Sequence, residues 1–120
     1  MPGCGSRSAS LGRVADLTPR QVAELVDAGD AQLVDVREPY EHEAGRIAGD
    51  VHIVLERLTA EAASIDRERP VVFYCRSGSR SDLAAQAFGA SGYEAHNLTG
   101  GLKAWVADGL PIEPADGRVA

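Results

Sequence analysis

PVVFYCRSGSRS, residues 70–81, carries the strongest structural signal in this sequence. Residues 71–74 form a short, β-rich apolar run, which is the pattern of a strand buried on both faces. A polar turn that contains glycine follows Cys75, and from Ser79 the apolar residues recur at helical spacing. The sequence therefore predicts a strand, a tight loop and a helix, with one cysteine between the strand and the helix.

The position of Cys75 has chemical consequences. The first backbone N–H groups of a helix lack intrahelical partners, and together with loop amides they favour negative charge. Arg76 and Arg80 add two positive charges nearby. We expect the Cys75 thiol to ionise more easily than an ordinary cysteine and to act as a nucleophile in an anion-binding loop. The alternative is a buried, inert cysteine at the end of a core strand.

Chain length, composition and net charge limit the class of protein and the kinds of partner that this sequence indicates. A chain of 120 residues with 44% hydrophobic and 25% charged residues is typical of one globular domain that needs no disulfide. The net charge of −6 argues against a general nucleic-acid or membrane-surface binder. We therefore expect no nucleic-acid or membrane partner, but a small anion attracted to the positive charges around Cys75.

The other cysteine, Cys4, lies in a polar leader without the apolar core of a signal peptide. A cytoplasmic, reducing location is the expectation, and it would keep Cys75 as a free thiol. Cys4 is a candidate to resolve an oxidised Cys75, although a cysteine in a terminal leader is more often simply exposed. The cysteine and histidine spacings predict no metal site, and we expect no cofactor.

Strands and helices alternate along the chain. Thr18, Pro19 and Gln21 form a helix start with a capping box, and glycines end several helices. The expected strands are 14–17, 32–36, 50–54, 71–74 and 94–98, and helical patterns cover 18–28, 39–44, 55–65, 79–91 and 102–108. This order predicts an α/β fold with a mainly parallel sheet covered on both faces. We expect a disordered leader at 1–13, one domain at 14–113 and a tail at 114–120.

Charged residues end the strand at 32–36. Because ligands of open α/β sheets bind outside the carboxyl ends of the strands, Asp35 and Arg37 either brace the Cys75 loop or help to hold an anion. The alternative is an ordinary surface ion pair. His52 is expected as a half-exposed strand residue, and His42 and His96 as structural or exposed groups. Trp105, with Leu102 and Val106 on the same helix face, is expected in the core.

Three motifs then resemble the rhodanese family, in the family's order and over most of residues 17–111. They are LVDVREPYEHEAGRI at 33–47, CRSGSRS at 75–81 and NLTGGLKAWVADGLPIE at 97–113. The resemblance implies a single five-stranded parallel sheet in which the Asp35 strand neighbours the Cys75 strand. The chain departs from the family pattern at residues 46–50, where RIAGD replaces a more usual HIPGA, and this leaves partner recognition open.

The resemblance also implies sulfur transfer through a persulfide on Cys75. The donor is thiosulfate or another persulfide, and the acceptor is cyanide, a thiol or a protein. Arg76 would bind the anionic donor, and Arg80 would do the same or pin the loop through Asp35 or another carboxylate. Loop N–H groups from residues 76–80 would stabilise the terminal sulfur.

Smaller residues complete the expected sulfur site. Ser77 and Ser79 would donate further hydrogen bonds, and Gly78 would allow the backbone to turn its amides inward. Two rival functions remain. A phosphatase or arsenate reductase would use a related loop, but its arginine lies one residue further from the cysteine than Arg80 does. A persulfide carrier or regulatory interaction module would use the same loop with little turnover.

Overall fold

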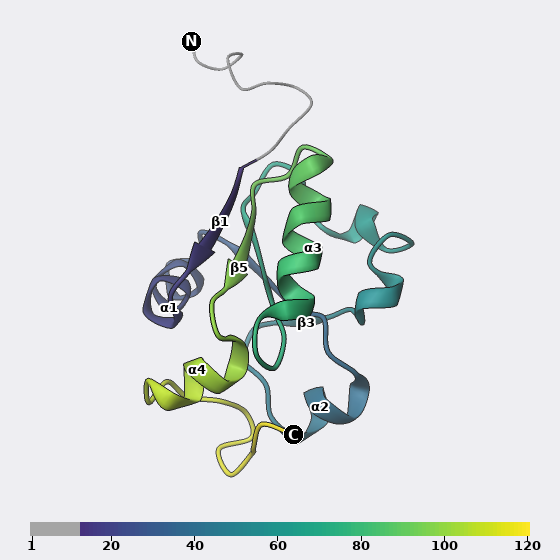
Figure 1. Cartoon of the computed structure of the whole chain (residues 1–120). Helices are drawn as coiled ribbons and strands as arrows, with labels where there is room; N and C mark the ends of the chain where they lie inside the picture. Colours follow the sequence, from purple (N-terminus) through teal and green to yellow (C-terminus); the bar gives the residue numbers. More distant parts are fainter. Residues whose placement is uncertain (1–12) are drawn as a thin grey trace.

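The computed structural model describes residues 13–120, and the predicted leader, with Cys4, lies outside the described residues except for Arg13. The chain order is β1 (Val14–Leu17), α1 (Pro19–Asp27), β2 (Gln32–Asp35), α2 (Pro39–Ala44), β3 (Val51–His52), the 3₁₀ helices η1 (Leu55–Arg57) and η2 (Ala62–Ser64), β4 (Val71–Tyr74), α3 (Ser79–Ala90), β5 (Ala95–Leu98) and α4 (Gly101–Ala107). Figure 1 shows the strands between the helices.

The five strands form one parallel sheet in the order β1-β5-β4-β2-β3. This confirms the predicted fold class, including the pairing of the Asp35 strand with the Cys75 strand, since Asp35 lies opposite Tyr74. The central strand β4 is buried at every position, as expected for a strand covered on both faces. The carboxyl ends of β2 and β4 therefore lie side by side.

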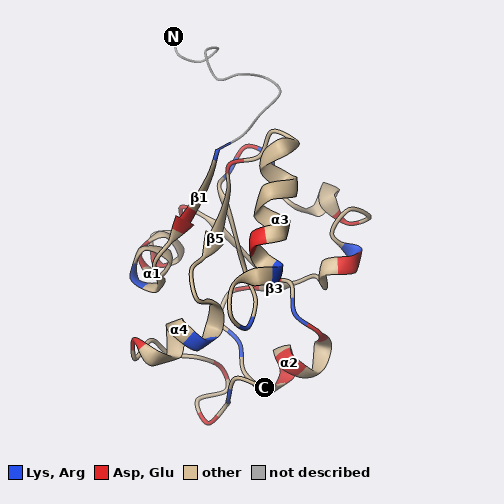
Figure 2. Ribbon diagram, in the orientation of Figure 1, with Lys and Arg blue, Asp and Glu red and all other residues tan. Residues whose placement is uncertain are grey.

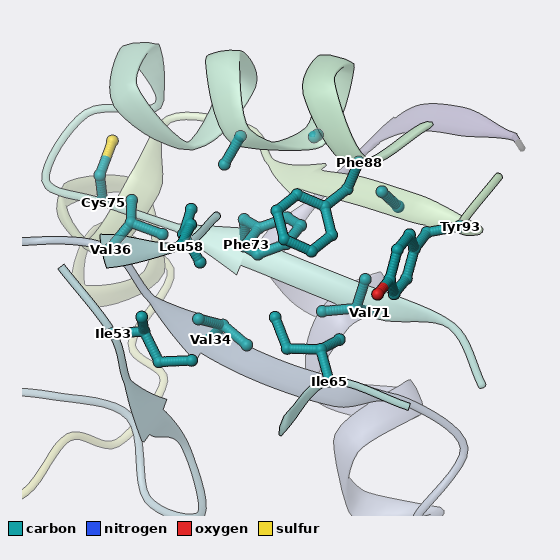
Figure 3. Close-up of a cluster of buried hydrophobic side chains, with 13 residues drawn as sticks. Val34, Val36, Ile53, Leu58, Ile65, Val71, Phe73, Cys75, Phe88 and Tyr93 are labelled. Atoms are coloured by element: carbon teal, nitrogen blue, oxygen red, sulfur yellow. The ribbon is translucent and has the colours of Figure 1, made fainter. Parts of the chain in front are cut away.

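Two apolar layers cover the sheet. On one face, α1 and α4 contribute Val22, Leu102 and Trp105 to a cluster with Leu33 and Val72 of the sheet. On the other face, the second cluster joins Phe88 of α3 and Leu58 to the strands, and Figure 3 shows this cluster with Cys75 at its edge. Trp105 is 4% exposed, which confirms the prediction that it belongs to the core.

Several predicted elements differ from the structure. The helix expected at 55–65 is wrong, because η1 and η2 are short 3₁₀ turns that present Leu58 and Ile65 separately to the sheet. The strand expected at 50–54 is only Val51–His52, since β3 is a short edge strand paired on one side. Val106 is 40% exposed and does not belong to the buried face of α4.

Both ends of the described chain are hydrogen-bonded to the domain. The Arg13 carbonyl accepts from Ala95 N at 2.8 Å, which continues the β1–β5 ladder. Beyond the predicted domain end at residue 113, Arg118 N donates to Ala44 O at 2.8 Å. The segment expected as a C-terminal tail thus returns to the end of α2, and the two lie side by side in Figure 1. No helix within residues 13–120 has the length and apolar character needed to cross a bilayer.

Candidate active site

The site is built on the turn between β4 and α3. Gly78 precedes the helix with φ of 108°, a conformation that is easy only for glycine. This turn directs the Gly78 N–H back toward the preceding strand, where it donates to the Cys75 sulfur at 3.1 Å. The thiol thus lies at the carboxyl end of a buried strand, and Figure 3 shows its sulfur turned away from the apolar cluster.

Four donors surround the Cys75 sulfur. Burial opposes ionisation of the thiol, but the hydroxyl of Ser81 and the backbone N–H groups of Ser81, Gly78 and Ser77 outweigh it. The pKa of Cys75 therefore lies below its usual value. This direction agrees with the sequence expectation. The residue as a whole is only 1% exposed, so the sulfur is enclosed by the loop rather than open to solvent.

The side chain that reaches the sulfur is Ser81, which the sequence analysis did not select. Its Oγ lies 3.4 Å from Cys75 Sγ, whereas Ser77 and Ser79 are exposed. A signal for Ser81 was present, because it continues the buried stripe of Ala84, Ala85 and Phe88 at helical spacing. A serine on a buried helix face must find a hydrogen-bond partner inside the protein.

Backbone hydrogen bonds from helix α4 hold the loop that carries Cys75. Leu102 N donates to the Cys75 carbonyl at 2.8 Å, and Lys103 N donates to the Arg76 carbonyl at 3.0 Å. These bonds fix both carbonyl oxygens against the start of α4. Gly101 makes this approach possible, because a Cβ there would lie 2.6 Å from the Cys75 and Arg76 backbone. Gly101, the first residue of α4, therefore belongs to the support of the loop that carries the thiol.

The two loop arginines have different surroundings. Arg76 is exposed, and its Nε donates to the Ala120 carbonyl at 3.0 Å. Arg80 instead donates through both terminal nitrogens to Glu41, at 2.8 and 2.9 Å. Glu41 is thus the carboxylate partner of Arg80, in place of Asp35, and it lies 39 positions away in the sequence. These hydrogen bonds raise the pKa of Arg80 and lower the pKa of Glu41.

Asp35 and Arg37 form a fully buried ion pair, so the alternative of a surface pair is wrong. Arg37 Nη2 lies 2.8 Å from Asp35 Oδ2 and also donates to the Gly45 carbonyl at 2.7 Å. Burial opposes the charge of Arg37, but the bond to Asp35 outweighs it and raises the pKa of the guanidinium. Within the described chain, the pair has no hydrogen bond to residues 75–81 and supports α2 instead.

Asp35, His42 and His52 bring possible metal-ligand atoms within 4.8 Å of one another. Hydrogen bonds already use these groups: His42 Nδ1 lies 2.9 Å from Asp35 Oδ2, and His52 Nε2 lies 2.7 Å from the Arg37 carbonyl. The two imidazole rings stack with centroids 4.4 Å apart. We interpret this cluster as a polar support between β2, α2 and β3.

Charges of both signs surround the site. Figure 2 shows basic segments at the start of α3 and in α4, and an acidic segment at α2, toward the end of the sheet where β5 stops. Fold and loop together define an α/β domain in which the sulfur of one cysteine lies in a ring of hydrogen-bond donors. Such a ring stabilises a single anionic atom.

Comparison with known proteins identifies the family to which this chain belongs. Residues 18–108 match the Rhodanese-like domain family, and the chain belongs to it. A sulfurtransferase of Allochromatium vinosum is 38% identical over 94 residues, which cover 78% of this chain and 88% of that protein. Thiosulfate sulfurtransferase GlpE of Pseudomonas aeruginosa is 34% identical over 101 residues, covering 83% and 87% respectively.

A solved structure shares the fold. The crystal structure of a rhodanese-related protein from Thermoplasma volcanium superimposes with a TM-score of 0.77 at 24% identity, covering 82% of this chain and 96% of that one. The family resemblance found in the three sequence motifs is therefore confirmed.

Proposed function

We propose that this protein is a sulfurtransferase that carries a sulfane sulfur on Cys75. The observation that carries the proposal is the ring of donors around one sulfur atom, in a chain that belongs to the rhodanese-like family. The same donors would stabilise the charge of a terminal persulfide sulfur, because that atom is also anionic. Relatives named sulfurtransferases support the general activity.

We propose thiosulfate, or a persulfide, as the donor. The Cys75 thiolate attacks the sulfane sulfur of thiosulfate, the sulfur–sulfur bond of the donor breaks, and sulfite leaves with the electron pair. A thiophilic acceptor then attacks the terminal sulfur of the Cys75 persulfide, and the thiolate is regenerated. With cyanide as acceptor the product is thiocyanate. Neither step requires a cofactor or a general base once the thiol is ionised.

The two arginines would act differently in this scheme. Arg76 is exposed, and we propose that it binds the anionic donor and the leaving sulfite. Arg80 is committed to Glu41 and contributes a fixed positive charge near the sulfur. Because Cys75 is 1% exposed, the donor has only narrow access to the sulfur.

The same burial favours a second candidate, a persulfide carrier that delivers sulfur to a partner protein with little turnover of its own. A cysteine that is 1% exposed is less accessible to free acceptors in solution than a thiol on the surface. The short loop between Cys75 and Arg80 counts against a phosphatase. For either candidate we propose a thiol or protein acceptor, a reducing cytoplasmic setting and no nucleic-acid partner.

Intact-mass measurement after incubation with thiosulfate tests the proposal. The protein should gain one sulfur atom, Cys75→Ser should gain none, and Cys4→Ser should behave like the parent chain. Equal labelling of both variants would contradict the assignment. Rapid steady-state formation of thiocyanate from thiosulfate and cyanide would identify an enzyme, whereas a stable persulfide that passes only to a protein thiol would identify a carrier.

A further inference from the structure

The Ser81 hydroxyl has three possible acceptors around it. Its Oγ lies 2.6 Å from Asn97 Oδ1, 3.2 Å from the Gly78 carbonyl and 3.4 Å from Cys75 Sγ. A hydroxyl carries one hydrogen and can donate only one full hydrogen bond at a time. Ser81 therefore cannot serve all three acceptors, and the shortest contact is the one to Asn97.

The orientation of the Asn97 amide makes it an acceptor toward Ser81. Asn97 Nδ2 donates to Asp16 Oδ1 at 3.2 Å, and the parallel register of β1 and β5 places these two residues opposite each other. Since the nitrogen faces the Asp16 carboxylate, the oxygen must face Ser81. Ser81 is fully buried and Asn97 is 6% exposed, so water does not readily replace either group.

The two protonation states of Cys75 use this arrangement differently. A neutral thiol can donate to Ser81 Oγ while Ser81 donates to Asn97, so both the thiol hydrogen and the hydroxyl hydrogen have an acceptor. A thiolate can only accept, and Ser81 can donate to it only by giving up its 2.6 Å bond to Asn97. Asn97 therefore competes with the sulfur for one hydrogen, and this competition favours the neutral thiol.

We propose that Asn97, oriented by Asp16, is a positioning residue that acts through Ser81 to limit how readily Cys75 ionises. The backbone N–H groups of the loop favour the thiolate, and Asn97 opposes them through the hydroxyl. Such a balance suits group transfer, because a thiolate that is too stable attacks poorly, and the best attacking thiol has a pKa near the ambient pH. The inference thus deepens the proposed function and rests on it for its biological use.

The other ionisable groups around the thiol remain in place when Asn97 is changed. They are Arg80 with its partner Glu41, the Asp35–Arg37 pair, Arg76, and Asp16 behind the amide. Asn97 itself is uncharged in both states. A change at this residue therefore alters the hydrogen bond to Ser81 without adding or removing a charge near the sulfur.

The test is a pH titration of thiolate absorbance in the full chain with Cys4→Ser, using Cys75→Ser as the blank. Asn97→Leu should lower the pKa of Cys75 by about 0.5–1 pH unit, the equivalent of one ordinary hydrogen bond. Ser81→Ala should raise the pKa. In the Ser81→Ala background, Asn97→Leu should have no effect, because its route to the sulfur is gone.

An unchanged or raised pKa in Asn97→Leu would overturn the proposal, as would an equal shift in the Ser81→Ala background. If Asn97→Leu does not fold, Asn97→Ala provides the test, since it removes the same acceptor and leaves every charge around the sulfur in place. It should lower the pKa of Cys75 in the same direction. Gln86→Leu, which replaces an exposed amide elsewhere on α3, is the matched control and should leave the pKa unchanged. The titration reads ionisation whether or not sulfur is transferred, so the two proposals can fail separately.

Discussion

Arg80 and Glu41 form a two-bond ion pair, at 2.8 and 2.9 Å, that joins the first turn of α3 to α2. The Glu41 side chain is 4% exposed and the Arg80 side chain is 33% exposed. Solvent is therefore largely excluded from the carboxylate but still reaches the guanidinium. This contact connects the cysteine loop to α2, which follows the buried Asp35–Arg37 pair in the chain. The loop is therefore held from α2 as well as from α4.

Glu41→Gln should weaken the fold in a pH-dependent way. Hydrogen bonds from Arg80 hold the pKa of Glu41 below its usual range, so the pair stabilises the fold above the unfolded pKa of about 4.3. That stability is lost as the pH falls through the lowered folded-state pKa. Near neutral pH the variant should lose about 1–3 kcal/mol. Urea unfolding from acid to neutral pH checks this, and parallel curves for the two proteins would contradict it.

Gly101→Ala should disturb the packing of α4 against the backbone of Cys75 and Arg76. The new Cβ would lie 2.6 Å from the Cys75 and Arg76 backbone, and φ of 63° is itself unfavourable for alanine. We expect a loss of more than about 2 kcal/mol in unfolding free energy and a higher pKa for Cys75. Gly109→Ala is the control, because φ is 78° there but no atom lies within 4 Å of the added Cβ. It should cost only about 1–2 kcal/mol and leave the thiol unchanged.

Arg37→Met should be among the most destabilising changes. It leaves the Asp35 carboxylate buried without its cation, which typically costs about 3–5 kcal/mol. Arg57→Ala is the comparison, since Arg57 pairs with Glu61 on the surface and should contribute less than about 1 kcal/mol. Thermal or urea unfolding distinguishes the two variants. Similar losses in both would show that burial of the Asp35–Arg37 pair has no energetic weight.

Arg76→Ala should raise the Michaelis constant for thiosulfate by about tenfold, the equivalent of roughly 1.4 kcal/mol. Arg76 is the exposed loop arginine, and its side chain is not part of the buried ion pair that Arg80 forms with Glu41. Steady-state kinetics with a neutral organic trisulfide provide the control, because that donor has no charge for the guanidinium to bind. An equal effect on both donors would remove Arg76 from anion binding.

The sequence was most informative where local patterns decide the structure. The capping box of Thr18 and Gln21 is present as predicted, because its bonds span only three residues. The apolar run at 71–74 is a buried strand, and Cys75 follows it as expected. Helical spacing at 55–65 correctly indicated that Leu58 and Ile65 are buried. It predicted one helix, however, whereas the structure has two short 3₁₀ turns, which bury the same side chains.

The less predictable parts of the site depend on long-range contacts. Nothing local indicates that Glu41, rather than Asp35, is the partner of Arg80, because the choice depends on how α2 packs beside α3. The hydrogen bond between Ser81 and Asn97 likewise joins a helix to a strand. Polar residues on buried faces could have indicated both Ser81 and Asn97, but the partner of each requires the three-dimensional arrangement.

The bonds from α4 to the Cys75 and Arg76 carbonyls have a consequence for biosynthesis. Because those donors lie 27 residues beyond each acceptor, a nascent chain on the ribosome contains the cysteine well before it contains the helix that fixes the loop. Until α4 has been synthesised and has folded onto the sheet, the newly made cysteine should react as an ordinary thiol. The lowered pKa of the thiol is therefore acquired only after α4 has packed against the sheet.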